Sequence, residues 1–106
     1  MRLVWEIDAG LPRPLVNKPV FDLRGRLIGI IDLLDFEAGV AGEFDGAEHR
    51  AALRHSHDVF REDDCRRHGL EYFMVTGPDM RSIPLVVDRM VSTRSRALWL
   101  RPEQRR

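Results

Sequence analysis

One short stretch of the chain is rich in carboxylates and has no basic residue. Its five acidic side chains, between positions 32 and 45, are Asp32, Asp35, Glu37, Glu43 and Asp45. Like charges brought together repel and raise each other's pKa unless a cation lies among them. Carboxylate oxygens suit Mg²⁺ or Mn²⁺, which keep water molecules that can meet a substrate phosphate. The stretch therefore predicts a divalent-metal site with Asp32, Glu43 and Asp45 as its ligands.

A purely structural role is the alternative for each carboxylate. Asp35 and Glu37 fall in an expected turn, where Asp is common, and we favour solvation of the turn for both. Glu43 and Asp45 also fit an exposed strand face. Asp32 is harder to explain in this way, because it interrupts the apolar run 27–34.

The elements that must position these residues follow from apolar periodicity and from the placement of Gly and Pro. A two-turn helix is expected at 2–9, with Leu3 and Ile7 on its apolar face and Val4 as a further candidate for that face. The three strands expected next are 20–23, 27–34 and 40–45, of which 27–34 reads as covered on both faces. If the last two strands pair through the turn 35–39, the carboxylates at 32, 43 and 45 converge at one end of the sheet.

The second half of the chain predicts a helix, a strand and a helix. Residues 47–68 lack Gly and Pro, and Gly69 follows as a helix end. A short strand is expected at 70–76. Ser82 can cap a last helix with Pro84 in its first turn. The apolar side of that helix comprises Leu85, Val86, Met90, Val91 and Leu98. The order is α-β-β-β-α-β-α, a mixed α/β sheet with helices on its faces.

Composition predicts one folded domain over 1–106. The chain is 43% apolar and 32% charged, enough for a hydrophobic core. Seventeen basic and seventeen acidic residues give zero net charge, so attraction to a polyanion must come from local patches. One candidate is 89–106, with six Arg against Glu103, although a solvated helix surface is favoured there. No run of eighteen apolar residues and no signal-peptide core occurs, so we expect a cytoplasmic protein without a membrane partner.

Two other chemistries receive little support. The residues that suggest zinc are His55, His57, Cys65 and His68. Their spacing matches no zinc finger, and surface histidines are favoured. Cys65 is the only cysteine, so no internal disulfide can form. No serine or cysteine has a discernible paired base, which disfavours nucleophilic catalysis by a side chain.

The order of several short motifs resembles a known family. The motifs are Gly29-Ile-Ile-Asp32-Leu-Leu-Asp35, Gly42-Glu43-Phe44-Asp45-Gly46 with His49, Asp58-x-x-Arg61-Glu62, and Gly69-Leu70 ahead of a strand. Over roughly 2–95 the chain looks like the small endonuclease-like domains of the PD-(D/E)XK superfamily, with kin similar to very-short-patch-repair endonucleases. The resemblance implies a restriction-endonuclease-like core, α-β-β-β-α-β.

The resemblance also implies roles for individual residues. Asp32 and Glu43 match the two metal-binding acids, and Phe44 would lend its backbone carbonyl. Asp45 stands where many members carry a lysine that activates water. His49 is the candidate for that role, since histidine exchanges protons near neutral pH.

Asp58 and Arg61 are spaced i, i+3 on the expected helix. They would pair there, and either orient the site or contact a phosphate. A structural ion pair is the favoured alternative for these two residues.

The amino end departs from the family pattern. Similar proteins have a longer first helix with an additional Glu, and often an upstream winged-helix domain of abortive-infection antitoxins. Here the first helix is shortened, and Glu6 is the available substitute.

The expected function is metal-dependent phosphodiester hydrolysis of nucleic acid, DNA in the first instance, with Mg²⁺ or Mn²⁺. A small nuclease covers little DNA, so we consider a homodimer. The alternative is an inactive relative that acts as a DNA-binding or regulatory module in a toxin–antitoxin or phage-defence system. A plain structural fragment is the third reading.

Overall fold

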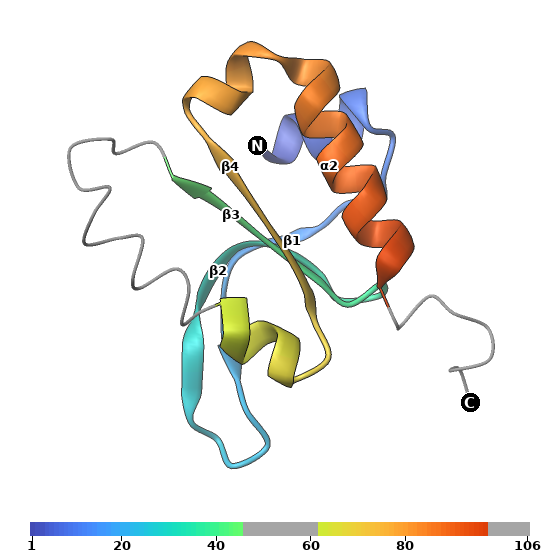
Figure 1. The fold of residues 1–106 in the computed structure, drawn as a ribbon. Helices are drawn as coiled ribbons and strands as arrows, with labels where there is room; N and C mark the ends of the chain where they lie inside the picture. Colours follow the sequence, from blue (N-terminus) through green and yellow to red (C-terminus); the bar gives the residue numbers. More distant parts are fainter. Residues whose placement is uncertain (46–61, 98–106) are drawn as a thin grey trace.

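A mixed sheet of four strands forms the centre of the protein. A computed structural model describes residues 1–45 and 62–97. The strands are β1 (Leu15–Phe21), β2 (Leu27–Asp35), β3 (Val40–Asp45) and β4 (Glu71–Thr76). They lie in the order β1-β2-β3-β4, antiparallel except for the parallel pair β3 and β4 (Figure 1). The predicted mixed α/β architecture is confirmed, with three successive strands and a fourth later in the chain.

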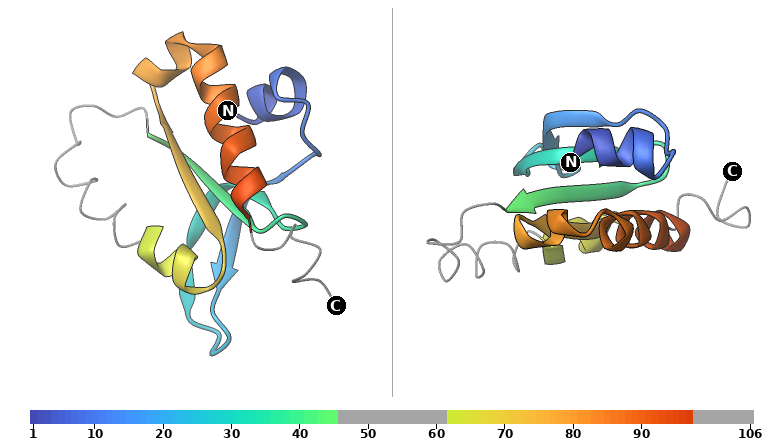
Figure 2. Two further views of the ribbon diagram at one scale, coloured as in Figure 1. Left: turned by 45° about the vertical axis from the view of Figure 1, so that its right-hand side comes forward. Right: turned by 90° about the horizontal axis from the view of Figure 1, so that it is seen from above.

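Helices cover both faces of the sheet. The helical elements are η1 (Val4–Asp8), residues 62–67, η3 (Pro78–Arg81) and α2 (Ile83–Arg96). Helix 62–67 belongs to the crossover that the parallel pair β3 and β4 requires. Seen from above in Figure 2, η1 lies level with β1 and β2, and α2 lies at the opposite end of the sheet. The remainder of the predicted helix 47–68 lies outside the described residues.

Two hydrophobic clusters pack on opposite faces of the sheet. The first joins Val4 and Trp5 of η1 and Val86 and Met90 of α2 to strand residues that include Phe73. In this cluster the rings of Trp5 and Phe73 stack in parallel, with their centroids 6.0 Å apart.

The second cluster joins Cys65 of helix 62–67 to residues of β2, β3 and β4, among them Leu34, Ala41 and Tyr72. Neighbouring residues along β2, β3 and β4 therefore contribute to different clusters, as strand alternation requires.

Of the three side chains considered for the apolar face of the first helix, only Val4 lies in the core. Leu3 and Ile7 are 60% and 73% exposed, whereas Val4 and Trp5 are buried. This turn is π-helical, so its wider winding shifts which side chains share a face. Trp5 Nε1 also donates a hydrogen bond to the Pro12 carbonyl at 2.6 Å, which holds the ring inside.

Strand β2 is covered along only part of its length. The prediction that it is buried on both faces is wrong for its first half, where Leu27 and Ile30 are more than half exposed. The reason is that β3 pairs only with Leu33–Asp35. The residues before Leu33 pair with β1 alone, and β1 is longer than predicted because Pro19 is tolerated on an edge strand.

Candidate functional site

Asp32 lies where two strands depart from regular geometry. Ile31 packs in the cluster of helix 62–67, but Leu33, two residues further on, packs in the cluster of α2. Residues two apart in a regular strand share a face, so β2 is distorted at Asp32. On β1, Asn17 falls between the partners of Ile31 and Leu33 and has a φ of 51°, in the left-handed region. Local backbone strain of this kind clusters at functional sites.

A hydrogen bond joins the Asp32 carboxylate to β3. Its Oδ2 accepts the backbone N–H of Phe44 at 2.8 Å. The backbone pairing of β2 with β3 ends at Leu33 and Gly42. Beyond that pair, the Asp32 side chain and not the β2 backbone accepts a hydrogen bond from β3. The carboxylate therefore lies beside the peptide that follows Glu43.

A cavity of about 460 Å³ opens at Asp32. Its lining includes Asp32, Asn17, Arg2 and Phe44, together with apolar side chains. Of the predicted metal-site residues, Asp32 and Phe44 share this cavity, whereas Glu43 and Asp45 do not line it. Phe44 was predicted for its carbonyl alone, and no sequence signal pointed to Asn17 or Arg2.

The predicted convergence of three carboxylates on one ion is not found. Across residues 1–45 and 62–97, no group of three or more His, Cys, Asp or Glu side chains could hold a metal ion. Glu43 is buried and Asp45 half-buried, and each has an interaction of its own. The Asp32 carboxylate is instead engaged by the Phe44 N–H. A site of two carboxylates with the Phe44 carbonyl stays a prediction.

Three predicted site residues cannot be placed against this geometry. His49, Asp58 and Arg61 lie outside the described residues. The same holds for His55 and His57 of the zinc reading. Within the described part, His68 engages its Nδ1 with the carbonyl of Asp64 at 2.7 Å.

Asp35 is a buried structural carboxylate and does not merely solvate a turn. It is 4% exposed, and its Oδ1 accepts the N–H of Ala38 at 2.9 Å. Its Oδ2 lies 2.7 Å from Nε of Arg94 on α2. No local sequence signal could have identified this pair, whose members are 59 residues apart.

The described arginines of the basic stretch 89–106 all pair within the chain. Arg89 contacts Asp79 at 2.8 Å and the carbonyl of Met74 at 2.7 Å. Arg94 pairs with Asp35, and Arg96 approaches Glu71 at 3.7 Å. Hydrogen bonds from the Thr76 backbone N–H and the Arg89 guanidinium lower the pKa of Asp79 below its ordinary value of 3.8. These arginines bind the fold together, and the other three lie outside the described residues.

Comparisons with known proteins found no matching family model, curated protein or solved structure. A search of the described helices for a membrane-spanning segment found none of sufficient length and apolarity.

Proposed function

We propose that the protein is a metal-dependent endonuclease-like domain that hydrolyses phosphodiester bonds of nucleic acid, DNA in the first instance. The observation that carries the proposal is the placement of Asp32. A carboxylate interrupts an apolar strand, lies at a distortion shared by β1 and β2, lines a cavity of about 460 Å³ and is tied to the peptide after Glu43. The strand order is also compatible with the core that the family resemblance implies.

The donor atoms fit a hard cation in part. Asp32 Oδ2 is engaged by Phe44, and no described residue hydrogen-bonds its Oδ1, which leaves one oxygen for a ligand. Asp32 and Glu43, with the Phe44 carbonyl, would hold Mg²⁺ or Mn²⁺. The bound ion would stabilise charge on the phosphate and lower the pKa of a water molecule.

The chain's own residues would do the rest of the work. The hydrogen bond from the Phe44 N–H fixes the orientation of the Asp32 carboxylate. The Arg2 side chain lines the cavity, pairs with Glu6 at 3.4 Å and is 46% exposed. Its guanidinium could also contact a phosphate there. Asp45 and His49 are proposed for the handling of the attacking water, and Asp58 with Arg61 for orientation of the site or contact with a phosphate.

Replacement of Asp32 by Asn tests the proposal directly. The Asn amide oxygen can still accept the Phe44 N–H, so the fold is kept while the ligand charge is lost. Plasmid and single-stranded DNA are incubated with Mn²⁺, and we expect Asp32→Asn to reduce cleavage by more than the roughly 10- to 100-fold typical of an outer-sphere change. Millimolar Mn²⁺ should also raise the melting temperature of the wild type but not of the variant.

Glu37→Gln is the matched control, because Glu37 is exposed in the turn that follows β2. It removes one carboxylate from the same acidic stretch and should leave both cleavage and the Mn²⁺ shift unchanged. Intact DNA at high concentrations of the wild-type protein with Mn²⁺ would overturn the catalytic proposal.

The second candidate is a non-catalytic DNA-binding or regulatory module of a toxin–antitoxin or phage-defence system. It is favoured by the lack of a three-ligand group among the described residues. This candidate predicts nucleic-acid binding without cleavage and without stabilisation by Mn²⁺. Either candidate would act in the cytoplasm, and light scattering on the free and DNA-bound protein tests the proposed homodimer.

A further inference from the structure

The hairpin of β1 and β2 extends away from the rest of the sheet. The residues of β2 before Leu33 have no pairing with β3, and Figure 1 shows the hairpin turn at the far end of the molecule from η1. The turn is held by Asp22, whose Oδ1 accepts the N–H groups of Arg24 and Arg26 at 2.9 Å each. Gly25 there has a φ of 82°, which an L side chain rarely adopts.

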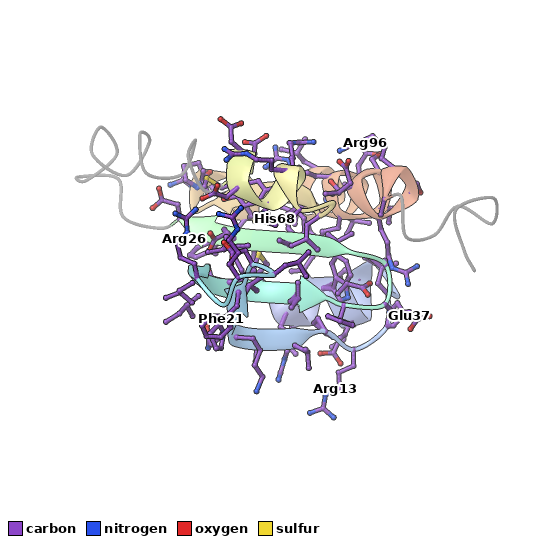
Figure 3. All side chains as sticks on the ribbon, turned by 90° about the horizontal axis from the view of Figure 1, so that it is seen from below. Arg13, Phe21, Arg26, Glu37, His68 and Arg96 are labelled. Atoms are coloured by element: carbon purple, nitrogen blue, oxygen red, sulfur yellow. The ribbon has the colours of Figure 1, made fainter. Side chains whose placement is uncertain are left out.

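Four nitrogen-bearing side chains from two distant parts of the sequence gather beside this turn. Arg24 and Arg26 of the hairpin and Arg67 and His68 at the end of helix 62–67 line one cavity of about 590 Å³, which we call the basic notch. Figure 3 shows Arg26 and His68 on the same side of the molecule, with Arg13 well away from both.

Positive charge prevails in the basic notch. Asp22 is the one carboxylate among its described lining residues, against three guanidinium groups. Asp22 approaches Arg26 at 3.6 Å, and Asp64, outside the lining, approaches Arg67 at 3.6 Å. Arg24 is exposed and pairs with no described carboxylate, so its charge is available to an anion.

An apolar groove of about 540 Å³ adjoins the basic notch. The two cavities share Asp22, Leu23, Arg67 and His68. The other lining residues of the groove are Val20, Phe21, Ile28, Leu34, Phe36 and Leu70. Two of these are aromatic and largely open to solvent, Phe21 at 56% and Phe36 at 70% exposure.

We propose that the notch and the groove together bind a single strand of nucleic acid, with phosphates at the arginines and bases over the exposed phenylalanines. Proteins that hold single strands combine a cationic groove with aromatic side chains on which bases stack. A duplex keeps its bases stacked inside and cannot use Phe21 and Phe36. The proposal rests on the proposed function for its nucleic-acid partner and adds the strandedness and the contact surface.

The test is binding in EDTA, where no metal-dependent cleavage takes place. Fluorescence anisotropy of the full chain is measured with a labelled oligodeoxynucleotide of about 12 nucleotides, within the usual site size of such modules. We expect the single strand to bind more tightly than the duplex of the same sequence. The double variant Arg24→Gln/Arg67→Gln should bind the single strand about tenfold more weakly. The slope of log affinity against log salt concentration should fall in magnitude by about 1.4, for two lost phosphate contacts.

Separate variants address stacking and specificity of the surface. Phe36→Ala should weaken single-strand binding by about fivefold or more, the loss expected for one stacked base. Arg13→Gln removes one positive charge away from the basic notch, and as a control it should change affinity less than twofold. All of the replaced side chains are exposed, so we expect each variant to fold. Thermal unfolding checks this expectation.

Several results would overturn the proposal. These are tighter binding of the duplex, an equal loss of affinity in Arg13→Gln, and displacement of the oligonucleotide by polyglutamate at equal charge, which would indicate an acidic protein partner. Failure of this inference is separable from failure of the proposed function. If Asp32→Asn abolishes cleavage while the double arginine variant binds normally, the endonuclease proposal is supported and the proposal of a strand-binding surface at the basic notch is rejected. If the single strand binds as proposed but the wild type cleaves no DNA, the binding surface is supported and the endonuclease proposal is rejected.

Discussion

At the scale of the single residue, the carboxylates of the acidic stretch divide into different roles. Asp35 is buried against Arg94 and also accepts the N–H of Ala38. Asp32 instead faces a cavity and binds one backbone N–H of β3. In the sequence the two aspartates look alike, because they lie three residues apart on one strand. Their surroundings differ: Asp35 has a structural role, and Asp32 is available for chemistry.

Removal of the Asp35 charge should destabilise the fold. Asp35→Asn keeps an acceptor for the Ala38 N–H but leaves the Arg94 guanidinium without its partner in a largely buried position. We expect a loss of about 3 kcal/mol in the free energy of unfolding, as for other broken buried pairs. Urea unfolding measures it, with Glu37→Gln as the control that should stay within about 0.5 kcal/mol. Equal midpoints for the two variants would contradict this role.

Asp79 should make stability depend on pH in acid. Hydrogen bonds donated by the Thr76 N–H and the Arg89 guanidinium hold the folded pKa of Asp79 below 3.8, the ordinary value that the unfolded chain retains. The stabilisation is therefore complete above that value and is lost as the pH falls towards the folded pKa, because the unfolded state takes up the proton first. Asp79→Asn should flatten the fall in urea midpoint below about pH 4. An unchanged acid dependence would count against this assignment.

At the scale of the element, the Phe73 ring of β4 lies over Gly42 of β3 and leaves no room for a side chain there. A Cβ on Gly42 would overlap the ring of Phe73, the ring that also stacks on Trp5. Gly42 is therefore needed for space, and its φ is not in the left-handed region. Within the Gly-Glu-Phe-Asp sequence near the candidate site, packing therefore requires glycine at the first position.

Substitution of Gly42 should thus be costly. Gly42→Ala forces the Phe73 ring to move within a closely packed cluster, and we expect a loss of about 1–3 kcal/mol. Gly77→Ala is the matched control, because a Cβ there meets nothing within 4 Å and its φ is −55°. Chemical denaturation compares the two variants, and equal stabilities would contradict the steric argument. Phe73→Leu in the Gly42→Ala background should recover part of the loss.

At the scale of the whole molecule, one sheet holds two cores together. Adjacent residues such as Phe73 and Tyr72 point into opposite clusters, so neither cluster can open without disturbing β4. Trp5 reports on the first cluster. Cys65, the only cysteine and fully buried, reports on the second.

The two faces should therefore unfold in one transition. In a Trp99→Phe background, Trp5 is the sole tryptophan, and its fluorescence should change at the same urea concentration at which Cys65 becomes reactive to a thiol reagent. Cys65→Ala provides the unlabelled control. Labelling of Cys65 at a clearly lower urea concentration would show that helix 62–67 opens on its own.

The sequence by itself determined most of the secondary structure. β3 was predicted at 40–45 and is found at Val40–Asp45, and β4 was predicted at 70–76 and is found at Glu71–Thr76. Alternation of apolar residues and the punctuation by Gly and Pro are local properties, readable from neighbouring residues. The placement of Asp32 inside a strand was also predictable for this reason.

Only the tertiary structure decided which groups meet. Three features join residues far apart in the chain: the pairing of Asp35 with Arg94, the hydrogen bond between Asp32 and Phe44, and the basic notch. The exposed first half of β2 likewise follows from where β3 stops pairing. Such contacts are set by the packing of whole elements, which a local pattern of residue types does not contain.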